Sequence, residues 1–181
     1  NKTKEVQKMN KQLRFLCQGA IVGAIYALLT LATWTFSSMQ IQVRLSEALC
    51  VLPLFTPAAI PGLFFGCFLS NILMGNIIDA IFGSLATLLA ALCTYLIGKL
   101  CKKKLRLFLA PLPAVVFNAI AVPLILYFGY GVVSFGEVTG VLPVLSLTAL
   151  SVFIGQTISC YGLGLPLTKM LEKLKFTKRF F

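Results

Sequence analysis

Long apolar stretches, separated by short blocks of basic residues, dominate this chain. From Leu45 to Gly98 only Glu47 and Asp79 carry a charge, and 59% of the 181 residues are hydrophobic against 12% charged. A transmembrane helix needs about 20 apolar residues, so a chain of this length has room for roughly five to seven spans and no sizeable soluble domain. The sequence therefore predicts an all-α integral membrane protein with a single membrane domain.

The basic residues predict the orientation in the membrane. They lie in three blocks, Lys2–Arg14, Lys99–Arg106 and Lys169–Arg179, with Arg44 as the one exception. Cytoplasmic segments of membrane proteins carry an excess of lysine and arginine, so both termini and the middle block are expected to face the cytoplasm. This orientation explains the net charge of +11 without a nucleic-acid partner. The basic N-terminal segment leads into a long apolar stretch that has no small-residue cleavage site, so no cleaved signal is expected.

Two cytoplasmic blocks require an even number of crossings between them, and this parity predicts six spans in all. Pro53, Pro57 and Pro61 recur at four-residue intervals and are expected to end a short second helix and to begin the third. An amphipathic interfacial helix is expected after the last span. The predicted spans are residues 15–33, 43–55, 58–74, 77–100, 107–127 and 141–165, with the interfacial helix at 167–181.

Four ionisable residues, Arg44, Glu47, Asp79 and Glu137, map to the side of the membrane away from the basic blocks. Charges within or beside apolar helices are costly and usually mark a ligand or a partner charge. Arg44 and Glu47 are three residues apart, so they are expected either to bind a ligand or to pair with each other. Asp79 is either a ligand-binding acid or a first-turn acid that complements the helix dipole. Glu137 is expected to be solvated in a loop.

Neutral polar and aromatic side chains add further candidates. Amides within the predicted spans either bind a ligand or form hydrogen bonds between helices; they are Asn71, Asn118 and Gln156. Aromatic residues at the outer helix ends either form a membrane-interface belt or stack on a flat ligand; they are Trp34, Tyr127 and Tyr130.

Patterns typical of catalysis are missing from the sequence. It contains no P-loop, no catalytic triad and no paired catalytic carboxylates. The six cysteines stand singly in apolar surroundings and there is no histidine, so no metal site is expected. We therefore expect no enzyme and no cofactor in this chain, and active transport would draw its energy from a partner.

Small residues form a stripe on the first predicted helix. Gly19, Ala20, Gly23, Ala24 and Ala27 recur at three- and four-residue spacing. Such a stripe lets another helix approach closely in a membrane.

Two segments of the chain point to a known family. Residues 42–49 read QVRLSEAL and lead through the proline-rich stretch to Phe64, and residues 79–91 read DAIFGSLATLLAA. These segments resemble the queuosine-precursor transporter family, QueT. The resemblance implies an S-component, the six-helix substrate-binding subunit of an energy-coupling factor (ECF) importer in the bacterial cytoplasmic membrane. The implied partners are a membrane coupling subunit and a pair of ATPases, which use the ATP.

The resemblance also implies a ligand and roles for the candidate residues. The ligand would be a 7-deazaguanine base with a guanine-like donor edge and, in some precursors, a cationic aminomethyl arm. We expect Glu47 to accept hydrogen bonds from the donor edge and Asp79 to pair with the arm. Arg44 would orient Glu47 or contact the ring carbonyl, Asn71 would add a hydrogen bond, and Trp34 or Tyr130 would stack on the base.

In S-components an alanine pair spaced four apart on the first helix contacts the coupling subunit, and Ala20 and Ala24 match that pattern. Two other readings stay open: an autonomous carrier or channel whose acids bind cations or protons, and an S-component for another vitamin. A membrane enzyme acting on lipid would need clustered acids or histidines near the cytoplasmic interface, which the sequence lacks.

Overall fold

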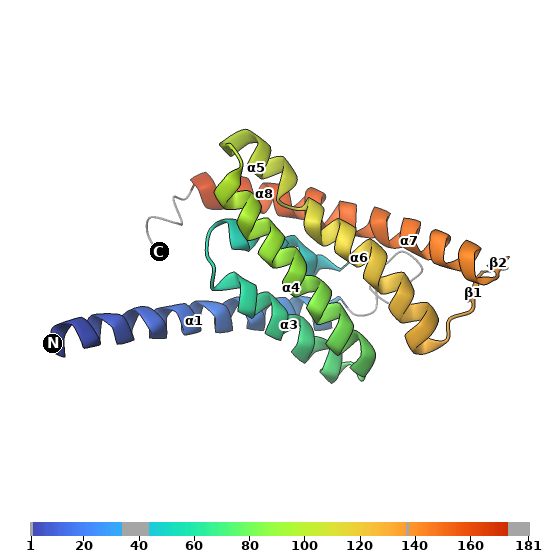
Figure 1. Ribbon diagram of the computed structural model, residues 1–181, viewed down its shortest axis with the longest axis horizontal. Coiled ribbons are helices and arrows are strands. Elements are labelled where there is room, and N and C mark those ends of the chain that lie inside the picture. Colours follow the sequence, from blue (N-terminus) through green and yellow to red (C-terminus); the bar gives the residue numbers. More distant parts are fainter. Residues whose placement is uncertain (1, 34–43, 137, 174–181) are drawn as a thin grey trace.

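The computed structural model describes residues 2–33, 44–136 and 138–173, and most of these are helical (Figure 1). In chain order the helical elements are α1 (Lys2–Ala32), the 3-10 helix η1 (Leu45–Leu54), α3 (Ala59–Leu73), α4 (Ile77–Leu100), α5 (Lys103–Leu109), α6 (Leu112–Leu124), the π-helical turn η2 (Ile125–Gly129), α7 (Val141–Thr157), the π-helical turn η3 (Ile158–Leu163) and α8 (Gly164–Lys173). A short antiparallel hairpin of β1 (Ser134–Phe135) and β2 (Val138–Thr139) lies between η2 and α7.

Helices of membrane-spanning length dominate the described part of the chain. Those long and apolar enough to cross a membrane are Met9–Ala32, Ile77–Leu100, Leu105–Gly129 and Val141–Lys173. The apolar helices η1 and α3 are shorter. A 3-10 helix rises about 2.0 Å per residue, so the ten residues of η1 extend about 20 Å, further than an α-helix of the same length. The protein is thus an all-α, multi-pass membrane protein with two short helices.

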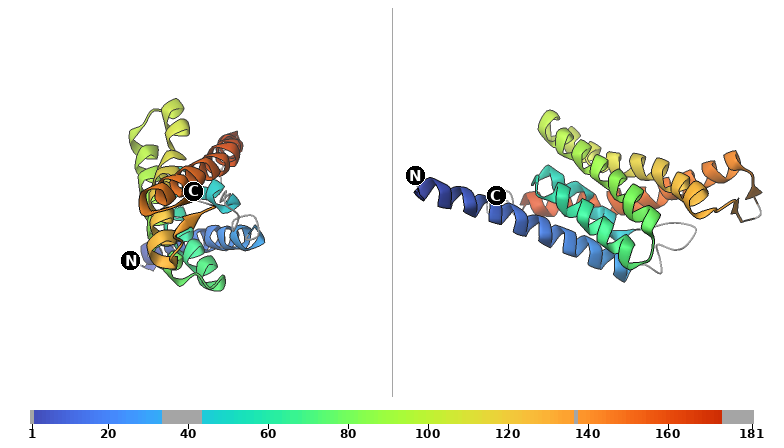
Figure 2. Two further views of the ribbon diagram at one scale, coloured as in Figure 1. Left: turned by 90° about the vertical axis from the view of Figure 1, so that its right-hand side faces the viewer. Right: turned by 60° about the horizontal axis from the view of Figure 1, so that its bottom comes forward.

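The helix ends that carry the described parts of the basic blocks lie at one end of the bundle. α1 begins and α4 ends at this end, and α5 and α8 lie side by side there (Figures 1 and 2). Arg106 of α5 donates a hydrogen bond to Glu172 of α8 at 3.0 Å, which ties the two helices together. We call this the basic end. The beginning of α4 and the β hairpin mark the opposite end, which we call the hairpin end.

Two helices extend beyond the predicted ranges. α1 begins at Lys2 rather than near residue 15, because the N-terminal segment contains no proline or glycine and is rich in good helix formers. α7, η3 and α8 follow one another without interruption from Val141 to Lys173, whereas the sequence predicts a break before an interfacial helix. Pro166 does not end the helix because it lies in the first turn of α8, directly after the π-helical turn η3. Residues 174–181 of the predicted interfacial helix lie outside the described residues.

Glycines bring α1 and α3 to backbone contact. An added Cβ on Gly62 would lie 2.6 Å from the Gly19 carbonyl oxygen, and one on Gly66 would lie 2.7 Å from the Gly23 carbonyl oxygen. Only glycine permits this approach, because real Cβ atoms do not come so close to backbone. Part of the small-residue stripe of α1 therefore packs within this chain.

We expect Gly62→Ala to lower the free energy of unfolding by about 1–3 kcal/mol, because the methyl group forces two backbones apart. Thermal unfolding in detergent measures the effect as a fall in the midpoint temperature. Gly162→Ala is the matched control, since a Cβ on Gly162 meets nothing within 4 Å. Equal midpoints for the two variants would contradict close packing of α1 on α3.

Candidate functional site

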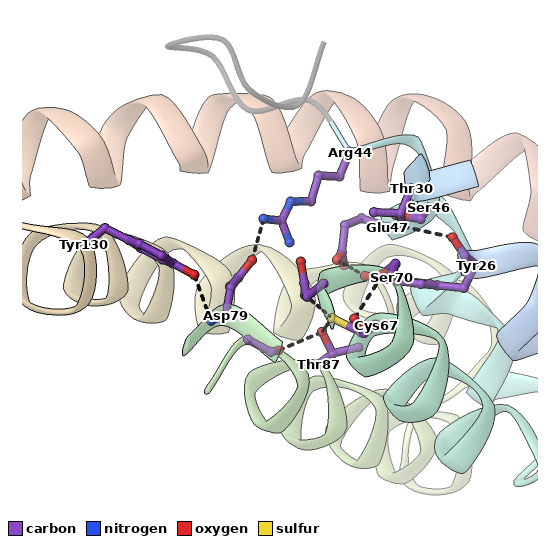
Figure 3. Close-up of polar contacts among 12 residues, drawn as sticks. Tyr26, Thr30, Arg44, Ser46, Glu47, Cys67, Ser70, Asp79, Thr87 and Tyr130 are labelled. Carbon is purple, nitrogen blue, oxygen red and sulfur yellow. Dashed lines mark hydrogen bonds and ion pairs between the residues drawn. The ribbon is translucent and has the colours of Figure 1, made fainter. Parts of the chain in front are cut away.

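Charged side chains gather where η1 approaches the beginning of α4 (Figure 3). Arg44 directly precedes η1, Glu47 lies in its first turn, and Asp79 lies in the first turn of α4. The fold buries both acids, since Glu47 is 2% and Asp79 5% exposed. Buried charges of this kind are expensive within a membrane protein, so they point to a functional site.

Arg44 pairs with Asp79 and not with Glu47. Its Nη2 donates to Asp79 Oδ2 at 2.9 Å, and the two side chains are 14% and 7% exposed. The i, i+3 pairing considered from the sequence requires both residues to be helical. Arg44 has an extended backbone instead, with φ −101° and ψ 107°, which directs the chain away from the face of η1. The ion pair therefore links η1 to α4 across a large sequence separation.

Glu47 is held by neutral donors. Tyr26 of α1 donates its phenol hydrogen to Glu47 Oε1 at 2.6 Å, and the Asn118 side chain of α6 also hydrogen-bonds the carboxylate. Beside this contact, Thr30 Oγ1 donates to Ser46 Oγ at 2.8 Å. These contacts attach the first turn of η1 to the C-terminal part of α1 (Figure 3).

Two buried acceptor atoms near the charged side chains, Asn71 Oδ1 and Asp79 Oδ1, have no hydrogen-bond partner among the described residues. Asn71 is fully buried, and its Nδ2 donates only to the weak acceptor Cys67 Sγ at 3.4 Å. Cys67 lies within electrostatic range of Arg44, Glu47 and Asp79, which places Asn71 beside the charged cluster. An unsatisfied buried acceptor costs free energy, so these atoms are suited to a further hydrogen-bond donor.

The local backbone of α4 makes room for Asp79. An added Cβ on Gly83, one turn further along, would collide with Asp79 Oδ1. The carboxylate therefore lies flat against its own helix. On its other side, the Asp79 backbone N–H donates to the phenol oxygen of Tyr130 at 3.4 Å (Figure 3).

A comparison with protein families identifies the kind of protein that carries this cluster. A model of the family described as "QueT transporter" matches residues 16–173. The chain belongs to the QueT transporter family. No curated protein and no solved structure matches it. Because the match covers η1, α3 and α4 together with the rest of the bundle, the buried cluster belongs to a transport protein.

The QueT fold brings most of the predicted site residues together. Arg44, Glu47, Asn71 and Asp79 form one cluster, and Tyr130 lies at its edge with 41% of its surface exposed. The other aromatic candidate, Trp34, lies outside the described residues, as does Glu137. In the part of the chain that the structure describes, no three His, Cys, Asp or Glu side chains are placed to hold a metal ion.

The predicted partner-binding alanines lie on a different surface of the QueT chain. Ala20 and Ala24 are exposed on α1 and line a groove of about 420 Å³ together with Phe65 and Leu69 of α3. Gly23, which belongs to the same stripe, faces α3 instead. Gly19 and Gly23 thus pack against α3 at the floor of the groove, and the two exposed alanines line it beside them.

Sequence reasoning missed Tyr26, which holds the Glu47 carboxylate. A signal for it exists in the sequence, because Tyr26 lies in the middle of the first apolar stretch. An aromatic belt explains tyrosines only at the membrane interfaces. A tyrosine at mid-span has to bury its hydroxyl with a partner, and a carboxylate on a neighbouring helix is a strong acceptor.

Proposed function

We propose that this chain is the substrate-binding component of an ECF-type importer, which captures a 7-deazaguanine precursor of queuosine from outside and delivers it inward. The observation that carries the proposal is the buried set of acceptors at Glu47, Asn71 and Asp79. A guanine-like edge offers a ring N–H and an exocyclic amine as donors, and hydrogen bonds to a carboxylate are the stronger charge-assisted kind. Membership in the QueT transporter family supports this ligand class.

The other candidates have roles around this acceptor set. Arg44 fixes Asp79 and closes the site between η1 and α4. Tyr130 and Trp34 are proposed to stack on the flat base, as aromatic side chains do with heterocycles. Entry is proposed from the hairpin end, which faces outside when the basic end faces the cytoplasm.

Energy for uptake is proposed to come from partner ATPases through a membrane coupling subunit. The sequence contains no nucleotide-binding motif, so ATP is not expected to bind this chain. The exposed alanines Ala20 and Ala24 are the proposed contact with the coupling subunit, because small residues allow helices to approach closely. The proposal retains six membrane crossings with both termini in the cytoplasm.

Equilibrium binding of aminomethyl-7-deazaguanine to the protein in nanodiscs tests the ligand, and uptake by cells tests the mechanism. We expect saturable binding that riboflavin, biotin and thiamine do not compete for. Uptake should require the coupling subunit and ATPases. Uptake without them would support an autonomous carrier, and binding of another vitamin in place of the deazaguanine would overturn the substrate.

We expect Asn71→Leu to weaken ligand binding about tenfold while leaving the midpoint of thermal unfolding unchanged or higher. Leucine removes an acceptor that has no partner among the described residues, so the ligand loses a hydrogen bond but the empty protein loses an unsatisfied buried group. Opposite signs of the two effects distinguish a ligand-binding amide from a structural one. A lower midpoint together with unchanged affinity would assign Asn71 to helix packing.

A further inference from the structure

The charges at the site do not balance. Arg44 is the only basic residue between Arg14 and Lys99, and the stretch from residue 107 to residue 168 contains none. Facing this one guanidinium are two buried carboxylates, those of Glu47 and Asp79. If all three groups are ionised, the cluster carries one excess negative charge.

No other basic side chain is near enough to compensate that charge. The remaining basic residues belong to three sequence blocks, and the described parts of these blocks lie on the helix ends at the basic end (Figure 1). Asp79 and Lys99 mark the two ends of α4, and 20 residues of α-helix separate charges by about 30 Å. Residues 34–43, which connect α1 to Arg44, include no ionisable side chain.

The excess charge belongs to Glu47. Arg44 donates to Asp79 Oδ2, so Asp79 has its cation. The hydrogen-bond partners of Glu47 are the Tyr26 hydroxyl and the Asn118 amide, which solvate a carboxylate without neutralising it, and the one nearby cation, Arg44, is shared with Asp79. Because Arg44 already occupies the position opposite Asp79, Glu47 is the better placed of the two acids to receive a cationic arm.

The unsatisfied atoms of the cluster are hydrogen-bond acceptors, so they carry partial negative charge, as the carboxylates carry negative charge. Asn71 Oδ1 and Asp79 Oδ1 are both acceptors, and the described residues supply no donor to either. A ligand that completes this site brings hydrogen-bond donors and one positive charge. A protonated primary amine has both, since an ammonium group carries a charge and three N–H donors and accepts nothing.

We propose that the site selects ligands with one net positive charge and that Glu47 is the residue that determines this selectivity. The inference rests on the proposed function and narrows it: among the 7-deazaguanines, the form with a protonated aminomethyl arm is the ligand and the neutral nitrile form is discriminated against. The arm pairs with Glu47, and the acceptors of Asn71 and Asp79 remain for the donors of the ring. Burial of a lone carboxylate disfavours the empty site, so a cationic ligand is bound more tightly than a neutral one of the same shape.

Equilibrium binding of the two forms, which share the ring and differ at the arm, tests this selectivity. We expect the wild type to bind the aminomethyl form more tightly than the nitrile form by a factor of about 10–100, the range for a hydrogen bond to a charged group. Glu47→Gln is expected to lose this preference through weaker binding of the amine. Glu47→Asp keeps the charge and should keep the preference at lower affinity.

The matched control is Glu172→Gln, the same change in an acid at the basic end, which should leave both affinities unchanged. Nitrile binding by Glu47→Gln shows that this variant is folded. Equal affinity of the wild type for both forms, or an undiminished preference in Glu47→Gln, overturns the charge selection and leaves the proposed function standing. If neither form binds to the wild type, the proposed function is overturned, and the proposed selectivity is overturned with it.

Discussion

Arg44→Gln is expected to destabilise the protein by about 3–5 kcal/mol, more than any other single substitution considered for this chain. Arg44 is the cation partner of Asp79, and both side chains are largely withdrawn from solvent. Removing the guanidinium leaves the Asp79 carboxylate buried without a counter-charge, and the loss of a partner costs more than the intact pair contributes. The charged contact between Arg44 and α4 is lost at the same time.

Thermal unfolding in detergent measures this loss, and a second substitution tests its cause. Arg44→Gln combined with Asp79→Asn should recover most of the lost stability, because two neutral amides can hydrogen-bond without an uncompensated charge. Arg106→Gln is the matched control, since it breaks the other ion pair of the described residues. That pair has side chains 25% and 21% exposed, and its loss should cost about 1 kcal/mol or less. Additive effects of Arg44→Gln and Asp79→Asn would show that the two groups act independently.

The charged residues of the site were predictable from the sequence, because a charge within or beside an apolar membrane helix is costly and usually has a function. That rule points to Arg44, Glu47 and Asp79, and the structure places them in one cluster. Their pairing was not predictable, because it depends on the backbone at Arg44. Helical spacing applies only inside a helix, and η1 begins one residue later, at Leu45.

Features that depend on contact between distant segments could not be predicted from the sequence. The glycines and alanines of α1 have similar size and spacing, yet Gly19 and Gly23 touch α3 while Ala20 and Ala24 are exposed. Hydrophobic periodicity cannot separate these faces, because lipid and protein interior are equally apolar. The continuous helix from α7 through α8 was missed for a local reason, since a π-helical turn before Pro166 is not visible in composition.

The exposed face of α1 around Ala24 is the proposed contact with the coupling subunit. We expect Ala24→Leu to reduce uptake by at least about tenfold while affinity for the ligand stays at the wild-type value. Ala24 lines the groove between α1 and α3 and has no part in the charged cluster. If the coupling subunit approaches α1 there, a leucine side chain holds the helices apart, and overpacking of about 1.4–3 kcal/mol corresponds to about a 10- to 150-fold weaker association.

Two measurements separate docking of the coupling subunit from capture of the ligand. One is uptake in cells that contain the energising module, and the other is ligand binding to the purified variant. Ala121→Leu is the matched control, because Ala121 lines a second apolar groove, of about 730 Å³, between α4 and α6. The same added volume there should leave uptake unchanged if the partner docks on α1. Equal losses in both variants would mean that uptake responds to any enlargement of a lipid-facing side chain. Loss of ligand affinity in Ala24→Leu would instead show that α1 transmits the change to Glu47, since Tyr26 on the opposite face of the same helix holds that carboxylate.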